Sequence, residues 1–335
     1  MKNKENMAFA GSSRRTWLKI SAASALAAAC GPMPVLAQSN YPERPVRIVV
    51  PSSPGGSLDA VARIIGQQLA EYWKTSVYIE NKAGANLIIG TSYAAKAPAD
   101  GYTLLFAHDG AMAINPVIYR KLQYGQNDFL PVAQVAVLPM VLYVNSEYPA
   151  RNFDQLMRAL RAQPGKLSLA VGGTSSQLTS ELFKSLAKVD YENISYKGAG
   201  PGLVALAAGE VQLSFADTGS AASMMQTGKI RPIAVAAPER VKQMPDVPLI
   251  SEIVPGYSVT SWSGLFAPAG TPPAVVEKIA ADVRAVMAAG EARSRLETLG
   301  VIPATSTPQK FGELIAADTA NWRELVKARN LYQNE

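Results

Sequence analysis

The chain has 335 residues, 48% of them apolar, and a formal net charge of +6. A chain of this length and composition can bury a core and is expected to form about two domains, which excludes an intrinsically disordered protein. Residues 1–37 contain five basic residues and one acidic residue, so residues 38–335 carry only +2. The charge therefore does not favour nucleic-acid binding.

The N-terminal segment carries the pattern of an export signal. Ser13–Lys19 (SRRTWLK) matches the twin-arginine pattern, an apolar stretch follows from Ile20 to Ala29, and Val35–Ala37 offers a cleavage site made of small residues. We predict that residues 1–37 are a twin-arginine signal peptide. The apolar stretch is too short for a membrane span, which needs about 20 residues.

The only cysteine, Cys30, lies within this segment. Residues 38–335 can therefore form no disulfide, thiol nucleophile or cysteine metal site. Leu26–Cys30 loosely resembles a lipidation site, but Ala27 stands where a bulky aliphatic residue is usual. We expect an exported, periplasmic protein, with lipid anchoring at Cys30 as the less favoured alternative.

After the lead-in Tyr41–Pro45, apolar runs alternate with helical patterns, which predicts α/β layers with largely parallel sheets. The predicted strands are Val46–Val50, Val77–Glu80, Tyr102–Ala107, Val132–Val144, Leu167–Val171, Ile194–Tyr196, Val211–Phe215, Ile230–Ala236 and Thr260–Phe266. Helices are expected between most of them. The C-terminal part should be helical from Pro272 to Met287, in a short helix closed by Gly300, and from Pro308 to about Asn330.

Two of the predicted strands, 132–144 and 260–266, are long and have no tight hairpin signal beside them. They bracket a block with its own strands and helices. We therefore predict a first domain formed by residues 41–141 and 262–335, and a second domain, residues 142–261, inserted into it. Two strands would cross between the domains, and such a hinge implies a cleft.

Five strand-to-helix corners are rich in small and polar residues. In open α/β sheets, ligands bind outside the carboxyl ends of the strands, where all five corners would lie. The corners are Pro51–Ser57, Ala107–Gly110, Gly172–Gln177, Lys197–Gly202 and Ala216–Ser220.

The first corner shows what such a turn can do. Ser57 is predicted to cap the following helix, and Asp59 to complement the positive end of its dipole. Gly55 and Gly56 carry no side chains, so the remaining N–H groups could receive an anionic or carbonyl oxygen. A single corner of this kind is more often an ordinary turn, so the interpretation requires that the other corners converge on it.

Other kinds of site find less support. Gly198–Gly202 lacks the dinucleotide-binding spacing, and the chain has no P-loop. His108 is the only histidine, which excludes a histidine metal cluster and makes it the only base for a hydrolytic triad. Ser92 lies in a sequence, GTSYA, that lacks the second glycine of a nucleophile elbow and follows helical residues.

Three charged residues at the corners have two interpretations each. Asp109 and Asp217 either cap the turns that follow them or hold the amine or hydroxyl donors of a ligand. Lys197 is expected to extend along the surface or to pair with a carboxylate rather than to take part in chemistry.

Four stretches of the sequence are familiar as a set. They are RIVVPSSPGGSLDAVARIIGQQL, IENKAGANLIIGTSYAAKAPADGYTLL, ISYKGAGPGLVALAAGEVQLSFAD and GKIRPIAVAAPERVKQMPDVPLISE. Together they resemble the substrate-binding receptors of the tripartite tricarboxylate transporters, the Bug receptors, in the right order over essentially all of residues 38–335. The resemblance implies a monomeric two-domain periplasmic binding protein of the Venus-flytrap type (type II-like). Each domain would be a mainly parallel sheet flanked by helices, and the protein would deliver a small carboxylate to a membrane permease without cofactor, metal or catalysis.

The candidate ligand-binding residues all come from the five corners, and the resemblance implies those of the Pro54–Ser57, His108–Asp109, Gly172–Ser176 and Asp217–Thr218 corners. The set is Ser53, Gly55, Gly56, Ser57, His108, Asp109, Gly173, Thr174, Ser175, Ser176, Lys197, Gly198, Asp217 and Thr218. The chain departs from the family at Ser52–Ser53, where an apolar pair is common, and at Asn86–Leu87, where a glycine pair is usual. Both departures argue against transferring the ligand of a relative.

We expect a receptor rather than an enzyme. The alternative is a periplasmic hydrolase or isomerase that acts on a small carboxylate through His108, with Asp109 or a nearby serine. One histidine without a second plausible base disfavours it. The residues leave dicarboxylates, amino acids and aromatic acids open as ligands. Asp109 and Asp217, if they face the cleft, would favour a ligand with an amine, a ring nitrogen or hydroxyls.

Overall fold

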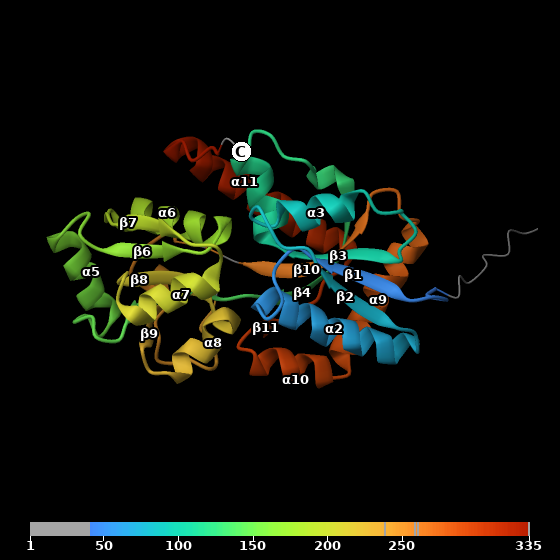
Figure 1. Ribbon diagram of the computed structural model, residues 1–335, viewed down its shortest axis with the longest axis horizontal. Helices are drawn as coiled ribbons and strands as arrows, with labels where there is room; N and C mark the ends of the chain where they lie inside the picture. Colours follow the sequence, from blue (N-terminus) through green and yellow to red (C-terminus); the bar gives the residue numbers. More distant parts are fainter. Residues whose placement is uncertain (1–40, 238, 258, 260, 334–335) are drawn as a thin grey trace, which may run out of the picture. The chain divides into compact units, whose positions relative to one another are not determined.

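The computed structural model describes residues 41–333 except 238, 258 and 260. The predicted signal peptide, residues 1–37 with Cys30, lies outside the described residues. The described chain contains two sheets of mixed direction, flanked by helices (Figure 1). In the part of the chain that is described, no helix is both long and apolar enough to span a bilayer.

The first sheet has six strands, and β1 runs parallel to both of its neighbours, β2 and β3. Their order across the sheet is β11 (Ile302–Pro303), β4 (Phe129–Val137), β10 (Trp262–Pro268), β3 (Thr103–His108), β1 (Val46–Val50) and β2 (Val77–Asn81). The helices of this part are α2 (Ser57–Trp73), α3 (Ile88–Ala95), α4 (Asn115–Ile118), α9 (Pro273–Ala288), α10 (Glu291–Thr298) and α11 (Pro308–Arg329). We call this part the first lobe.

The second sheet has five strands, and β6 runs parallel to β7 and β8. Their order is β7 (Glu192–Ser195), β6 (Ser168–Val171), β8 (Leu213–Asp217), β5 (Met140–Asn145) and β9 (Ile230–Ala236). The helices of this part are α5 (Phe153–Ala162), α6 (Thr174–Ala187), α7 (Ala199–Ala208) and α8 (Thr218–Gln226). We call it the second lobe.

The predicted strand 132–144 is two strands. β4 ends at Val137 in the first sheet and β5 begins at Met140 in the second, with Leu138 and Pro139 between them. Pro139 has no N–H to continue a ladder of hydrogen bonds, which explains the interruption. The chain returns at Ser261, whose carbonyl accepts a hydrogen bond of 2.8 Å from the N–H of Leu138. The two crossing segments are therefore bonded to each other.

The α/β fold class with two sheets is confirmed, although the sheets are mixed rather than mainly parallel. β4 carries the chain out of the first sheet and β10 carries it back, so these neighbours must run in opposite directions. β5 is likewise antiparallel to β8 and β9. The other predicted strands agree with the observed ones to within two residues at each end.

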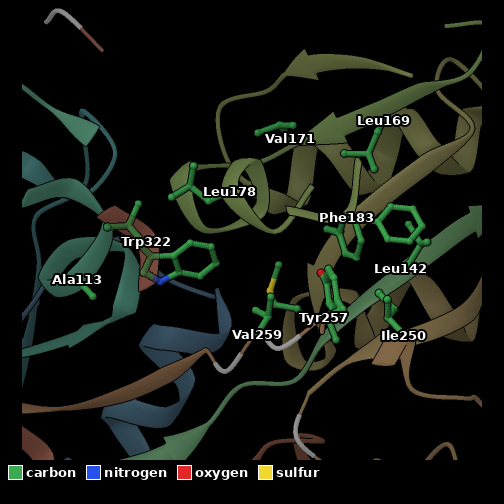
Figure 2. Close-up of a cluster of buried hydrophobic side chains, with 14 of the residues drawn as sticks. Ala113, Leu142, Leu169, Val171, Leu178, Phe183, Ile250, Tyr257, Val259 and Trp322 are labelled. Carbon is green, nitrogen blue, oxygen red and sulfur yellow. The ribbon is translucent and has the colours of Figure 1, made fainter. Parts of the chain in front are cut away.

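The largest hydrophobic cluster includes residues of both lobes. It joins Ala113 and Trp322 of the first lobe to Leu178 and Phe183 of α6 (Figure 2). Val259, just before the return crossing, belongs to the same cluster. Burial of apolar surface therefore holds the lobes together as well as each lobe by itself.

Candidate functional site

The five predicted corners follow the carboxyl ends of β1, β3, β6, β7 and β8. Because β1 and β3 are parallel neighbours, their corners lie at the same edge of the first sheet. The corners after β6, β7 and β8 share one edge of the second sheet for the same reason. The requirement that the corners converge is met within each sheet.

Hydrogen bonds also join corners of opposite lobes. The hydroxyl oxygens of Ser57 and Ser220 are 3.4 Å apart, and Ser175 Oγ donates to Asp109 Oδ1 at 3.4 Å. Thr218, which is buried, donates through Oγ1 to the carbonyl of Gly300 at 2.6 Å. The structure thus brings the edges of the two sheets together, as a site between two lobes requires.

The helix after the first corner begins one residue earlier than predicted. Its N-cap is Gly56, in an extended conformation (φ −79°, ψ 168°), and Ser57 is already the first helical residue. The prediction that Ser57 caps α2 is therefore wrong. Within the described residues no side chain caps this helix start, so the hydroxyl of Ser57 is left to face Ser220.

Two corners of the second lobe repeat this arrangement. Gly173 and Gly198 are the N-caps of α6 and α7, with φ of 151° and 114°. These are conformations that side chains disfavour. As far as the described residues go, neither helix start has a side-chain cap. Three helix starts therefore offer backbone donors at the positive end of a helix dipole, an arrangement that receives anions.

The hydroxyls of the Gly172–Gln177 corner hold the corner itself. Ser176 Oγ accepts a hydrogen bond from the N–H of Gly172 at 2.9 Å and donates to the carbonyl of Gly173 at 3.0 Å. Thr174 is buried and donates to Asn115 Oδ1 of the first lobe at 3.1 Å. Both side chains therefore have partners within the chain and act by shaping the corner.

His108 and Asp109 differ in accessibility. His108 is partly exposed, and its Nδ1 accepts a hydrogen bond of 2.9 Å from the N–H of Gly110. The same nitrogen lies 3.1 Å from Asp109 Oδ1, so the Gly110 N–H and the Asp109 carboxylate compete for it and the tautomer of the ring decides between them. Asp109 is only 1% exposed, and its Oδ1 accepts a hydrogen bond of 2.8 Å from Ser261 Oγ.

A π-helix, Gly110–Ile114, follows Asp109, and nothing in the sequence pattern predicted it. Side chains from a later segment satisfy two of its carbonyls. Tyr124 Oη donates to Ala111 and Gln126 Nε2 donates to Met112, both at 2.6 Å. Such turns are rare and often lie at functional sites.

The remaining predicted residues divide between structural and exposed positions. Asp217 caps α8, because its Oδ1 accepts from the Ser220 N–H at 2.9 Å and its Oδ2 from Ser220 Oγ at 2.6 Å. The structure thus shows the capping alternative for Asp217. Ser53 and Lys197 are exposed, and their side chains have no hydrogen-bond partner among residues 41–333 as described.

The loop that departs from the usual glycine pair adopts a conformation suited to glycine. Ala85, Asn86 and Leu87 all have positive φ, at 45°, 48° and 74°. Each such residue costs roughly 1–2 kcal/mol in this region. Asn86 offsets part of this cost, because its Nδ2 donates to Tyr119 Oη at 2.7 Å and its carbonyl accepts from Asn115 Nδ2 at 2.8 Å.

Neither of two mapped cavities contains a residue of the predicted site. The larger, of about 310 Å³, lies beside the 85–87 loop, and the other, of about 260 Å³, lies near Arg44 and Arg47. The described residues hold no group of three or more metal-ligating side chains. The candidate site therefore consists of the convergent corners alone.

Asp59 does more than complement a helix dipole. It is 3% exposed and accepts hydrogen bonds from the Gly55 N–H, Arg63 Nε and Asn81 Nδ2, each at 2.9 Å. Burial raises the pKa of this carboxyl, but the hydrogen bonds from Arg63, Gly55 and Asn81 outweigh burial and keep the pKa below its usual value. Because Gly55 gives its N–H to Asp59, this corner offers a ligand the donors further along, at the start of α2.

Sequence reasoning missed three residues that organise the site, Asn115, Ser261 and Asp318. Asn115 is fully buried and joins the 85–87 loop to Thr174 of the second lobe. Asp318, on α11, accepts a hydrogen bond of 3.0 Å from Trp262 Nε1. Burial and the charge of Asp109 raise the pKa of Asp318 to about 7. Their partners are distant in sequence, so no local pattern could reveal them.

Comparison with known proteins identifies relatives over most of the chain. The family model for the tripartite tricarboxylate transporter family receptor matches residues 61–331. The structure resembles that of R. palustris Rpa4515 with adipate, at a TM-score of 0.81 and 34% identity, covering 86% of this chain and 97% of that one. It also resembles the periplasmic binding protein BugD, at a TM-score of 0.79 and 30% identity over 88% and 100% of the two chains. A third similar structure is MatC from Rhodopseudomonas palustris with bound malate. Its TM-score is 0.76 and its sequence identity 31%, covering 85% of this chain and 100% of that one.

The hydrogen bonds of Asp59 predict a large effect of a small substitution. Asp59→Asn replaces one acceptor oxygen with a donor in a buried set of three donors, so it should lower the free energy of unfolding by about 1–3 kcal/mol at pH 7. Asp154→Asn is the control, because Asp154 is an exposed first-turn residue of α5 and should cost about 0.3–1 kcal/mol. Urea denaturation measures both.

The effect of Asp59→Asn should also depend on pH. The lowered pKa of Asp59 contributes stability above its usual value of 3.8, and this contribution is lost as the pH falls through the folded-state value. The difference between wild type and variant should therefore shrink below about pH 4. Equal losses for Asp59→Asn and Asp154→Asn would contradict the assigned role.

Asp318 predicts the opposite pH dependence. Because the pKa of Asp318 is raised in the folded state, its protonated carboxyl stabilises the folded protein at acid pH. This stabilisation is lost as the pH rises through about 7. Asp318→Asn keeps an oxygen acceptor for Trp262 but removes the charge, so its stability relative to wild type should increase between pH 5 and pH 8, by at most about 1.4 kcal/mol per pH unit. Glu324→Gln, an exposed change on the same helix, should leave the wild-type profile unchanged. Parallel profiles for wild type and Asp318→Asn would refute the prediction.

Proposed function

The chain belongs to the family of tripartite tricarboxylate transporter receptors, and on that premise we propose that it is an extracytoplasmic receptor for a small organic carboxylate. The carboxylate binds between the two lobes, which act as separate domains joined at the crossing segments. The receptor then delivers it to a membrane permease of the tripartite tricarboxylate type. Export by the twin-arginine segment places the monomeric receptor in the periplasm.

The observation that carries this proposal is the set of helix starts at Gly56, Gly173 and Gly198. Each is a glycine N-cap, and in the described residues none has a side-chain cap. Backbone N–H groups at the positive ends of helices bind carboxylate oxygens without a charged side chain. Because the three starts come from both lobes, a ligand held by them favours closure of the lobes.

The same geometry and two similar structures support the ligand class that we propose. Two of the similar structures contain adipate and malate, which are both dicarboxylates. Helix starts on two lobes suit a molecule with an anionic group at each end. An amine-bearing ligand loses its main support, because Asp109 is buried against Ser261 and Asp217 caps α8. We therefore propose a small dicarboxylate.

The geometry does not favour the enzyme alternative. A general base must offer a free lone pair to the substrate. His108 Nδ1 is engaged within the protein, 2.9 Å from the Gly110 nitrogen and 3.1 Å from Asp109 Oδ1, and the carboxylate of Asp109 is only 1% exposed. The proposed receptor therefore binds its ligand without chemical change.

A screen of melting temperatures tests the proposed function. The purified protein is heated with adipate, malate, glutamate or benzoate, and with dimethyl adipate as a control that lacks both charges. A dicarboxylate should raise the melting temperature, because at about 100 times its dissociation constant a ligand stabilises the folded state by about 2.7 kcal/mol. If no dicarboxylate shifts the melt, or if the diester shifts it equally, the proposed ligand class is wrong.

Gly56→Val tests the role of the first corner. A side chain here meets only Ser53 O at 4.0 Å and φ is −79°, so the protein should fold, while the added methyl groups obstruct the start of α2. We expect at least roughly a tenfold loss of affinity, since about 1.4 kcal/mol of lost binding is tenfold. Isothermal titration calorimetry with the dicarboxylate from the screen measures it.

Gly125→Val is the matched control for Gly56→Val. Gly125 is also an extended N-cap glycine (φ −121°) with free space around its Cα, but it lies outside the five corners. This control should bind with wild-type affinity. If Gly56→Val also binds like wild type, the first corner is only a turn.

A further inference from the structure

We propose that Asp109 is a positioning residue, whose carboxylate holds the hinge and the second lobe in the geometry that closes on a ligand. This inference rests on the proposed receptor function but assigns Asp109 a role other than ligand contact. It makes Ser261, which lies outside the five corners, a determinant of ligand release.

The carboxylate of Asp109 connects three separate segments. Asp109 follows β3 in the first lobe, Ser261 lies on the return crossing, and Ser175 lies in the first turn of α6. Ser261 Oγ donates to Asp109 Oδ1 at 2.8 Å, and Ser175 Oγ donates to the same oxygen at 3.4 Å. One oxygen atom therefore links the first lobe, the hinge and the second lobe.

Ser261 also joins the two crossing segments. Its carbonyl accepts from the N–H of Leu138, while its hydroxyl donates to Asp109. Ser261 is 5% exposed, so water does not readily replace either bond. The orientation of both crossings is thus tied to the side chain of Asp109.

Burial argues against direct contact between Asp109 and a ligand. A carboxylate that is 1% exposed must find its donors within the protein, and its Oδ1 is surrounded by the two serine hydroxyls and by His108 Nδ1 at 3.1 Å. The two bonds differ in what motion does to them. Separation of the lobes breaks the bond to Ser175, whereas Ser261 lies at the hinge itself and moves least. The bond to Ser261 therefore holds the carboxylate of Asp109 in place, and the bond to Ser175 favours the closed arrangement of the lobes.

The experiment compares Ser261→Ala with Ser263→Ala. Both serines are buried, two residues apart, but in the described part of the chain Ser263 Oγ has no hydrogen-bond partner. If Asp109 acts through Ser261, then Ser261→Ala should speed release of adipate, or of another dicarboxylate found in the screen, by roughly tenfold, as loss of one charge-assisted hydrogen bond implies. Ser263→Ala should release at the wild-type rate. Equal rates for the two variants would overturn the proposal.

Substitutions of Asp109 complete a double-mutant cycle. Asp109→Asn keeps an acceptor oxygen and should release the ligand at a rate between those of wild type and Asp109→Ala. In the Asp109→Ala background, Ser261→Ala should have no further effect, because its partner is gone. Additive effects of the two alanine substitutions would contradict the proposal. If Asp109→Ala fails to fold, the cycle is run with Asp109→Asn.

A measurement without ligand separates this inference from the proposed function. Spin labels are attached to Arg158→Cys on α5 and Glu277→Cys on α9, both exposed, in a chain carrying Cys30→Ser. Ser261→Ala should broaden the distribution of distances between the labels and Ser263→Ala should not. If wild type binds no carboxylate but Ser261→Ala broadens the distribution, the receptor function fails and the positioning role stands. An unchanged distribution with normal ligand binding refutes the positioning role alone.

Discussion

The hydrogen bond between Leu138 and Ser261 joins the outgoing and returning chain at the point where both pass from one sheet to the other. Every strand of the second sheet lies between these two residues in sequence. The contact continues the antiparallel pairing of β4 and β10, which gives the first sheet its mixed direction. It also places Ser261 beside Asp109, and through it beside the corners of both lobes. The hinge and the candidate site are therefore built from the same few residues.

Stability and binding make opposite demands at the corners. A side-chain cap stabilises a helix start by about 0.5–2 kcal/mol relative to alanine and by roughly a few tenths of a kcal/mol relative to glycine. α5 and α11 have such caps from Asn152 and Thr307. α2, α6 and α7 begin with glycine instead, and in the described residues they have no side-chain cap. Other hydrogen bonds stabilise these corners: the Gly55 N–H donates to the carboxylate of Asp59, and the Gly172 N–H donates to the hydroxyl of Ser176. These bonds hold the loops in place and leave the starts of α2, α6 and α7 without a side-chain cap from the described residues.

Local patterns in the sequence were sufficient for most elements but not for their terminal residues. The sequence predicts the strands 46–50 and 230–236 with their observed limits, because both are short runs rich in Val and Ile. The sequence does not distinguish Gly56 from Ser57 as the N-cap of α2, because both residue types are found at N-caps and tertiary contacts decide between them. The run 132–144 is predicted as one strand because apolar residues continue through Leu138. Pro139 is the only sign in the sequence that β4 ends and β5 begins there. Asp109 and Ser261 are 152 residues apart, so their contact has no local signal.

The glycine N-caps have an evolutionary consequence. Almost any residue that replaces a donor side chain removes the donor, but every residue except proline carries a backbone N–H. Mutation at Gly56, Gly173 or Gly198 can therefore obstruct the three helix starts but can rarely delete their donors. In the proposed receptor, the backbone donors that bind a carboxylate therefore survive most substitutions, while the side chains around them are free to change. Under the proposed function, a lineage built on this scaffold can exchange one organic acid for another without first losing its affinity for acids.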